Sequence, residues 1–127
     1  MRKARHAIAA LMLVLAAMPA WTAELIMVEE HGCPWCARWT AEIGPIYAKT
    51  EEGAQAPLRR IDIASTSRSG VAFASPPVFT PTFVLVEDGI EVGRIEGYPG
   101  EDFFWGMLGQ ILERLAPKDA YQKEDSS

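Results

Sequence analysis

The stretch GCPWC, residues 32–36, stands between an apolar run and a segment with helical character, and it decides the fold. Residues 25–29 are mostly apolar, partly β-branched, and end at a polar turn, which is typical of a short buried strand. Pro34 suits the first turn of a helix, where a backbone N–H would have no partner in any case. The sequence therefore predicts a strand that leads through Cys33 into a helix over residues 34–43.

Cys33 and Cys36 are the only two cysteines of the chain, and their spacing suits dithiol chemistry. A helix N-terminus favours negative charge, so we expect the pKa of the Cys33 thiol to be lowered. Cys36 lies one turn further on, less exposed, where it can attack a disulfide formed at Cys33. A purely structural bridge over three residues would close almost no loop and stabilise little. We therefore predict Cys33 as the nucleophile and Cys36 as the resolving thiol.

A metal site is a weaker interpretation of the same cysteines. Zinc needs three or four protein ligands, and beyond residue 23 the chain adds only one histidine, His31, to Cys33 and Cys36. We expect no resident metal and no other cofactor. A Cu(I) site bridged to a partner protein stays open as an alternative.

The rest of the sequence predicts an α/β fold. Residues 58–63 alternate between apolar and polar side chains, which predicts a second strand. Residues 82–86 and 90–95 flank the turn Asp88-Gly89 and are predicted to form a hairpin. Residues 46–56 favour a further helical piece, and residues 64–79 a loop with one short helix. A helix between the first two strands makes them parallel. The predicted architecture is a mixed central sheet of about four strands flanked by helices.

Apolar side chains recur every three or four residues between 101 and 115, which predicts an amphipathic helix. We expect Trp39 and Trp105 to be packing residues and Trp35 to be exposed. The face predicted to join the core consists of Phe103, Phe104, Met107, Leu108, Ile111, Leu112 and Leu115.

The first 23 residues have the features of a secretory signal peptide. Arg2, Lys3 and Arg5 precede an apolar run of about a dozen residues, too short for the roughly 20 that span a bilayer, and small residues follow it. We expect export to the periplasm, a domain over residues 24–117 and a polar tail over residues 118–127. The leader holds three of the 12 basic residues and none of the 17 acidic ones, so the remaining chain is acidic and unsuited to nucleic acid.

The motif Cys33-Pro34-Trp35-Cys36 after a strand, with Thr80-Pro81-Thr82-Phe83 opening a later one, resembles the thioredoxin superfamily. The resemblance implies that Pro81 is cis and packs beside the cysteines, and that the backbone of Thr80 binds an incoming peptide. Because Trp35 lies between the cysteines and should be exposed, we also assign Trp35 and its neighbour Pro34 to partner contact. The sequence departs from many thioredoxins at Met27, where those proteins carry a buried acid.

Longer runs resemble the SoxS family of thioredoxin-like proteins, which are encoded with bacterial sulfur-oxidation (Sox) enzymes. The resemblance implies that a partner such as the sulfur carrier SoxYZ is reduced and that a membrane thiol transporter supplies the electrons. We expect the protein to be a monomer. The runs that carry it are residues 36–39 (CARW), 41–45 (AEIGP), 57–60 (PLRR), 79–85 (FTPTFVL) and 96–105 (EGYPGEDFFW).

Three other functions remain compatible with the sequence. The same dithiol chemistry can run in reverse and donate disulfides, because the direction depends on a reduction potential that Pro34 and Trp35 do not determine. A binding module with a permanently oxidised Cys33–Cys36 pair and a Cu(I) transfer protein are the alternatives from other classes.

Overall fold

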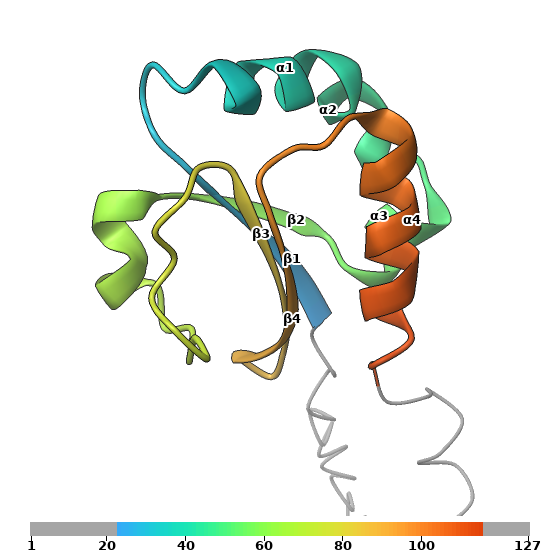
Figure 1. Cartoon of the computed structure of the whole chain (residues 1–127). Helices are drawn as coiled ribbons and strands as arrows, with labels where there is room; N and C mark the ends of the chain where they lie inside the picture. The colour runs from blue at the N-terminus through green and yellow to red at the C-terminus, as the bar shows by residue number, and fades with distance from the viewer. Residues whose placement is uncertain (1–22, 116–127) are drawn as a thin grey trace, which may run out of the picture.

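The computed structural model of the chain describes residues 23–115 (Figure 1). The predicted signal peptide, apart from Ala23, and the predicted polar tail lie outside the described residues. None of the helices within residues 23–115 has the length and apolar character needed to cross a membrane.

A four-stranded mixed sheet forms the centre of the domain, as the sequence predicted. Its strands are β1 (Ala23–Glu29), β2 (Leu58–Asp62), β3 (Thr82–Glu87) and β4 (Ile90–Glu96), in the order β2-β1-β3-β4. β1 and β2 are parallel, whereas β3 is antiparallel to both β1 and β4. The pair Val28↔Thr82 brings the end of β1 next to the start of β3, so the segments beyond these two residues meet at one edge of the sheet.

Helices cover the sheet unequally on its two faces (Figure 1). On one face lie α1 (Pro34–Glu42) and α4 (Glu101–Leu112), with α2 (Gly44–Tyr47) and α3 (Glu51–Gln55) following α1. The opposite face carries Ile26, Val28, Val84 and Val86 and is covered by the 3-10 helix η1 (Ile63–Arg68) and the loop after it. The short helix expected within residues 64–79 is therefore η1, beginning one residue earlier.

An aromatic cluster holds α1 on the sheet. The ring of Trp39 lies 5.2 Å from that of Phe83 and 5.7 Å from that of Phe104, measured between centroids, and all three side chains are fully buried. Such pairs add to the stabilisation that burial alone provides. Trp105 is partly buried and stacks on Tyr47 with centroids 6.1 Å apart. Both tryptophans are packing residues, as predicted, and Trp39 anchors the helix that begins at the cysteines.

The predicted core face of the last helix was too wide. Phe104, Leu108, Ile111 and Leu112 are buried, but Phe103 is 69% exposed and Met107 is 38% exposed. A helix that packs on a sheet buries only a stripe of limited width. Phe103 and Met107 each precede a buried residue by one position, so they lie at the edge of this stripe and are partly turned to solvent. The helix also ends at Leu112, and Leu115 packs against the core from the following turn.

Candidate active site

Cys33 occupies the N-cap of α1, at the point where β1 and its turn meet the helix. Its Sγ accepts a hydrogen bond from the backbone N–H of Cys36 at 3.1 Å, which occupies one of the donors left free at a helix start. Gly32 has a φ of 79°, a backbone conformation that residues other than glycine rarely adopt. The local sequence thus places a sulfur atom at the positive end of the helix dipole.

The two cysteines form a disulfide in this structure, and their surroundings differ. The Cα atoms of Cys33 and Cys36 lie 5.3 Å apart, within the ordinary range for such a bond. Cys36 is only 5% exposed, whereas Cys33 is half-buried and Trp35 is 52% exposed. Cys33 is the sulfur that a large partner can reach, and Cys36 is shielded behind it.

The Thr80–Pro81 peptide bond is cis, as the resemblance to thioredoxins implied. Its loop is tied to the turn before the cysteines, because the hydroxyl of Thr80 donates a hydrogen bond of 2.7 Å to Oε1 of Glu30. The carbonyl of Pro81 in turn accepts from the N–H of Gly97 at 2.7 Å. Segments around residues 30, 80 and 97 are therefore joined at this loop.

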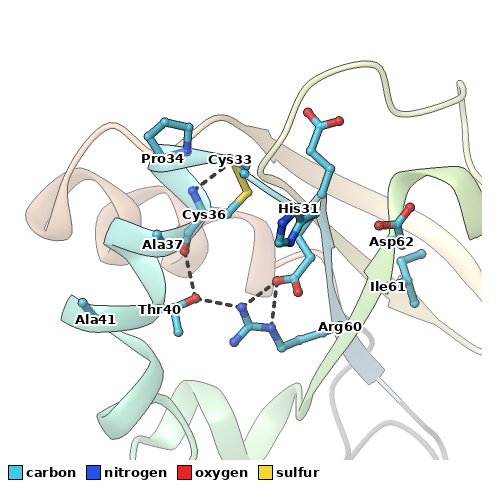
Figure 2. A pocket seen from close by; sticks show the side chains of 13 residues that line it. His31, Cys33, Pro34, Cys36, Ala37, Thr40, Ala41, Arg60, Ile61 and Asp62 are labelled. Carbon is cyan, nitrogen blue, oxygen red and sulfur yellow. Dashed lines mark hydrogen bonds and ion pairs between the residues drawn. A yellow bond between two sulfur atoms is a disulfide. The ribbon is translucent and has the colours of Figure 1, made fainter.

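A groove opens beside the disulfide, between α1 and β2 (Figure 2). Of the predicted site residues, Cys33, Pro34 and Cys36 line this groove, while Trp35, Thr80 and Pro81 do not. The remaining lining residues are Glu29, Glu30, His31, Gly32, Ala37, Thr40, Ala41, Arg60, Ile61 and Asp62. Within residues 23–115, no three His, Cys, Asp or Glu side chains gather as a metal site would require.

Arg60 and Thr40 were missed in the sequence, although they connect the groove to the cysteines. Arg60 bonds to Glu29 and to the hydroxyl of Thr40, and that hydroxyl donates to the carbonyl of Cys36 (Figure 2). Residues 29 and 60 are far apart in the chain and meet only because β1 and β2 pair in parallel. No local pattern in the sequence indicated this contact.

A second set of charges lies along the exposed side of α1. Arg38 lies over the ring of Trp35, 5.6 Å from its centroid, and forms an ion pair of 2.8 Å with Glu42. Glu42 also accepts a hydrogen bond from the hydroxyl of Tyr98. The bond from Arg38 and then that from Tyr98 hold the pKa of Glu42 below its ordinary value. These contacts join Trp35 to the loop that precedes α4.

Comparison with solved structures relates this chain to a thioredoxin. No family model matches the chain, and no curated protein does either. The crystal structure of the periplasmic thioredoxin SoxS from Paracoccus pantotrophus, in its reduced form, superposes with a TM-score of 0.70. The two sequences are 49% identical over 72% of this chain and 97% of that one.

The chain belongs to the family of SoxS-type thioredoxins.

Membership of the SoxS family accounts for the fold and for the redox-active cysteine pair at the start of α1. The solved SoxS is described as reduced, whereas Cys33 and Cys36 are joined here. A dithiol and a disulfide are the two states between which a thioredoxin cycles. The SoxS relative is a periplasmic protein.

Proposed function

We propose that this chain is an exported thiol–disulfide oxidoreductase that reduces a mixed disulfide on a partner protein. The observation that carries the proposal is the Cys33–Cys36 disulfide at the N-terminus of α1, with one sulfur accessible and the other buried. A buried second thiol next to an exposed one suits a resolving role, because it meets the mixed disulfide and is shielded from outside thiols. Membership of the SoxS family supports the same chemistry.

The proposed reaction moves two electrons from the dithiol to the partner. The thiolate of Cys33 attacks the partner's mixed disulfide, expels one sulfur as a thiolate and becomes disulfide-bonded to the other. Cys36 then loses its proton and attacks Sγ of Cys33, which releases the partner's cysteine as a thiolate. The products are a free partner cysteine and the Cys33–Cys36 disulfide. A dithiol donor of the membrane must afterwards return two electrons and two protons.

The proposed partner is a periplasmic Sox protein, first of all the sulfur carrier SoxYZ, and the proposed donor is a membrane thiol transporter. Family likeness supports both. We assign partner binding to the backbone of Thr80, to Pro81, and to Pro34 and the exposed ring of Trp35. Residues 1–23 would be the signal peptide that delivers the domain to the periplasm, where the protein would act as a monomer.

A trapping experiment tests this function. In the variant Cys36→Ser, an adduct on Cys33 has no resolving thiol, so partners should accumulate on it in the native periplasm. We expect mass spectrometry to identify one dominant adduct, on the cysteine of SoxYZ. The double variant Cys33→Ser/Cys36→Ser is the matched control and should hold nothing.

The other outcomes separate the alternatives. Many unrelated adducts would indicate a general oxidoreductase. A disulfide donor would instead be indicated if the oxidised parent protein, whose Cys33–Cys36 disulfide a partner thiolate can attack, oxidised a reduced partner and became a dithiol itself. Absence of any adduct, together with a Cys33 that reacts slowly with an alkylating agent, would overturn the catalytic proposal and leave a binding module.

A further inference from the structure

A continuous chain of polar contacts runs from the edge strand to the buried cysteine. Nε and Nη2 of Arg60 lie 2.8 and 2.6 Å from Oε2 of Glu29, and Nη2 also donates to Oγ1 of Thr40 at 2.7 Å. The same Thr40 hydroxyl donates to the carbonyl oxygen of Cys36 at 2.8 Å. The guanidinium group is thus held from β1 and from α1, and two short hydrogen bonds separate it from the backbone of Cys36.

The interior beside Cys36 supplies no charge of its own. Within residues 23–115, Thr82 is the one polar or charged residue that is buried, and Met27, where many thioredoxins carry a buried acid, is fully buried and apolar. The two tyrosines in the same cluster, Tyr47 and Tyr98, have raised pKa values and stay neutral. A thiolate formed at Cys36 would therefore face apolar side chains on the core side, which disfavours the charged form.

The groove that Cys36 lines also carries charged side chains. Arg60 from β2 is the cation among them, and Glu29, Glu30 and Asp62 are the acids, with His31 as the remaining titratable group. Glu30 is engaged with the hydroxyl of Thr80, and Asp62 accepts from the N–H of Ala64 at the start of η1. Glu29 forms an ion pair with Arg60, and Arg60 donates to Thr40, so the guanidinium group lies between the acid and the residue that contacts Cys36.

We propose that Arg60 is a positioning residue for the resolving step, held by Glu29 and Thr40 so that its positive charge stabilises the Cys36 thiolate. This inference deepens the proposed function, because it concerns the step in which Cys36 gives up its proton and attacks Sγ of Cys33. A nearby opposite charge favours the ionised form of a thiol, and the hydrogen bonds through Thr40 hold the guanidinium of Arg60 next to the backbone of Cys36. Arg60 supplies this charge from the groove, where the core offers none.

The test uses the thiolate of Cys36 alone. In the full-length variant Cys33→Ser, Cys36 is the only cysteine, so the ultraviolet absorbance of the thiolate can be titrated against pH without any partner protein. Arg60→Gln is introduced into this background to remove the charge, and Arg60→Lys to keep it. Arg59→Gln is the matched control, because Arg59 lies on the same strand but pairs with Glu24 and bonds to Ser69.

We expect Arg60→Gln to move the titration midpoint of the Cys36 thiol to higher pH. Arg60→Lys, which keeps a positive charge, should leave the midpoint close to that of the protein with Arg60. Arg59→Gln should leave the midpoint unchanged, and Glu29→Gln, which removes the acid opposing Arg60, should move it to lower pH. With both cysteines present, Arg60→Gln should slow the release of a partner from its mixed disulfide with Cys33. We expect a rate about three- to tenfold lower near neutral pH, as for the loss of one partly screened charge.

Equal midpoints for Arg60→Gln and Arg59→Gln in folded protein would overturn the inference. So would an Arg60→Lys variant that titrates like Arg60→Gln, because the side chain would then act through its shape and not through its charge. Thermal unfolding of each variant verifies the fold. Failure of the trapping experiment would instead reject the proposed function, since the titration needs no partner.

Discussion

Glu30 joins the two loops of the candidate site through a single contact. Its carboxylate accepts the hydrogen bond from Thr80, the residue before the cis peptide bond, across 50 positions of sequence. The contact is exposed, so its contribution to stability should be small, but it orients the backbone that we assign to partner binding.

We predict that Glu30→Ala lowers the affinity for a disulfide partner while leaving the chemical step intact. Loss of one hydrogen bond should cost about 1 kcal/mol, which corresponds to a severalfold rise in KM with little change in kcat. Glu30→Gln keeps an acceptor for Thr80 and is the matched control. Steady-state reduction of a disulfide peptide measures both constants, and an equal rise of KM in the two variants would contradict the assigned role of the hydrogen bond.

At the scale of elements, α4 shows how narrow the buried face of a helix is. Phe104 packs edge-on against Phe83, with centroids 5.0 Å apart, while the adjacent Phe103 is largely exposed. Two neighbouring residues of the same kind therefore have very different structural roles.

We predict that Phe104→Ala lowers the free energy of unfolding by about 3–5 kcal/mol, because it leaves a cavity against Trp39 and the sheet. Phe103→Ala is the matched control and should change stability by less than about 0.5 kcal/mol. Urea denaturation monitored by tryptophan fluorescence measures both values. Similar losses in the two variants would mean that the face of α4 is placed wrongly.

At the scale of the whole molecule, Glu42 links α1 to the loop that precedes α4. It lies in α1 and is bonded to Arg38 and to Tyr98, which belongs to the loop before α4. These bonds lower the pKa of Glu42 below its ordinary value of 4.5. A carboxyl whose pKa is lower in the folded state stabilises the fold above that ordinary value, and the contribution is lost as pH falls through the folded-state pKa.

We predict that Glu42→Gln lowers Tm at neutral pH and that the difference from the parent protein shrinks as the pH falls below 4.5. Glu113→Gln removes a carboxylate just after α4 and controls for the change in net charge. Thermal unfolding followed by circular dichroism over a pH series measures the effect. A difference that stays constant down to strongly acid pH would show that the ionised carboxylate is not the stabilising form.

Much of this protein follows from local patterns in its sequence. Strands and helices were predicted from periodicity, proline and turn residues, and Cys33 was placed at a helix start from the motif alone. These features depend on a few neighbouring residues, whose backbone preferences act over one or two turns. The parallel direction of β1 and β2 and the antiparallel direction of β3 and β4 followed from the helix and the tight turn that connect them, whereas the pairing of β1 with β3 did not.

Only the tertiary structure decided which side chains meet across the fold. The parallel register of β1 and β2 brings Arg60 to Glu29 and Thr40, and the closeness of two loops brings Glu30 to Thr80. The exposure of Phe103 likewise depends on how α4 is rotated against the sheet. Such contacts arise from packing between distant segments, and a pattern confined to one segment carries no information about the side chains that another segment will place beside it.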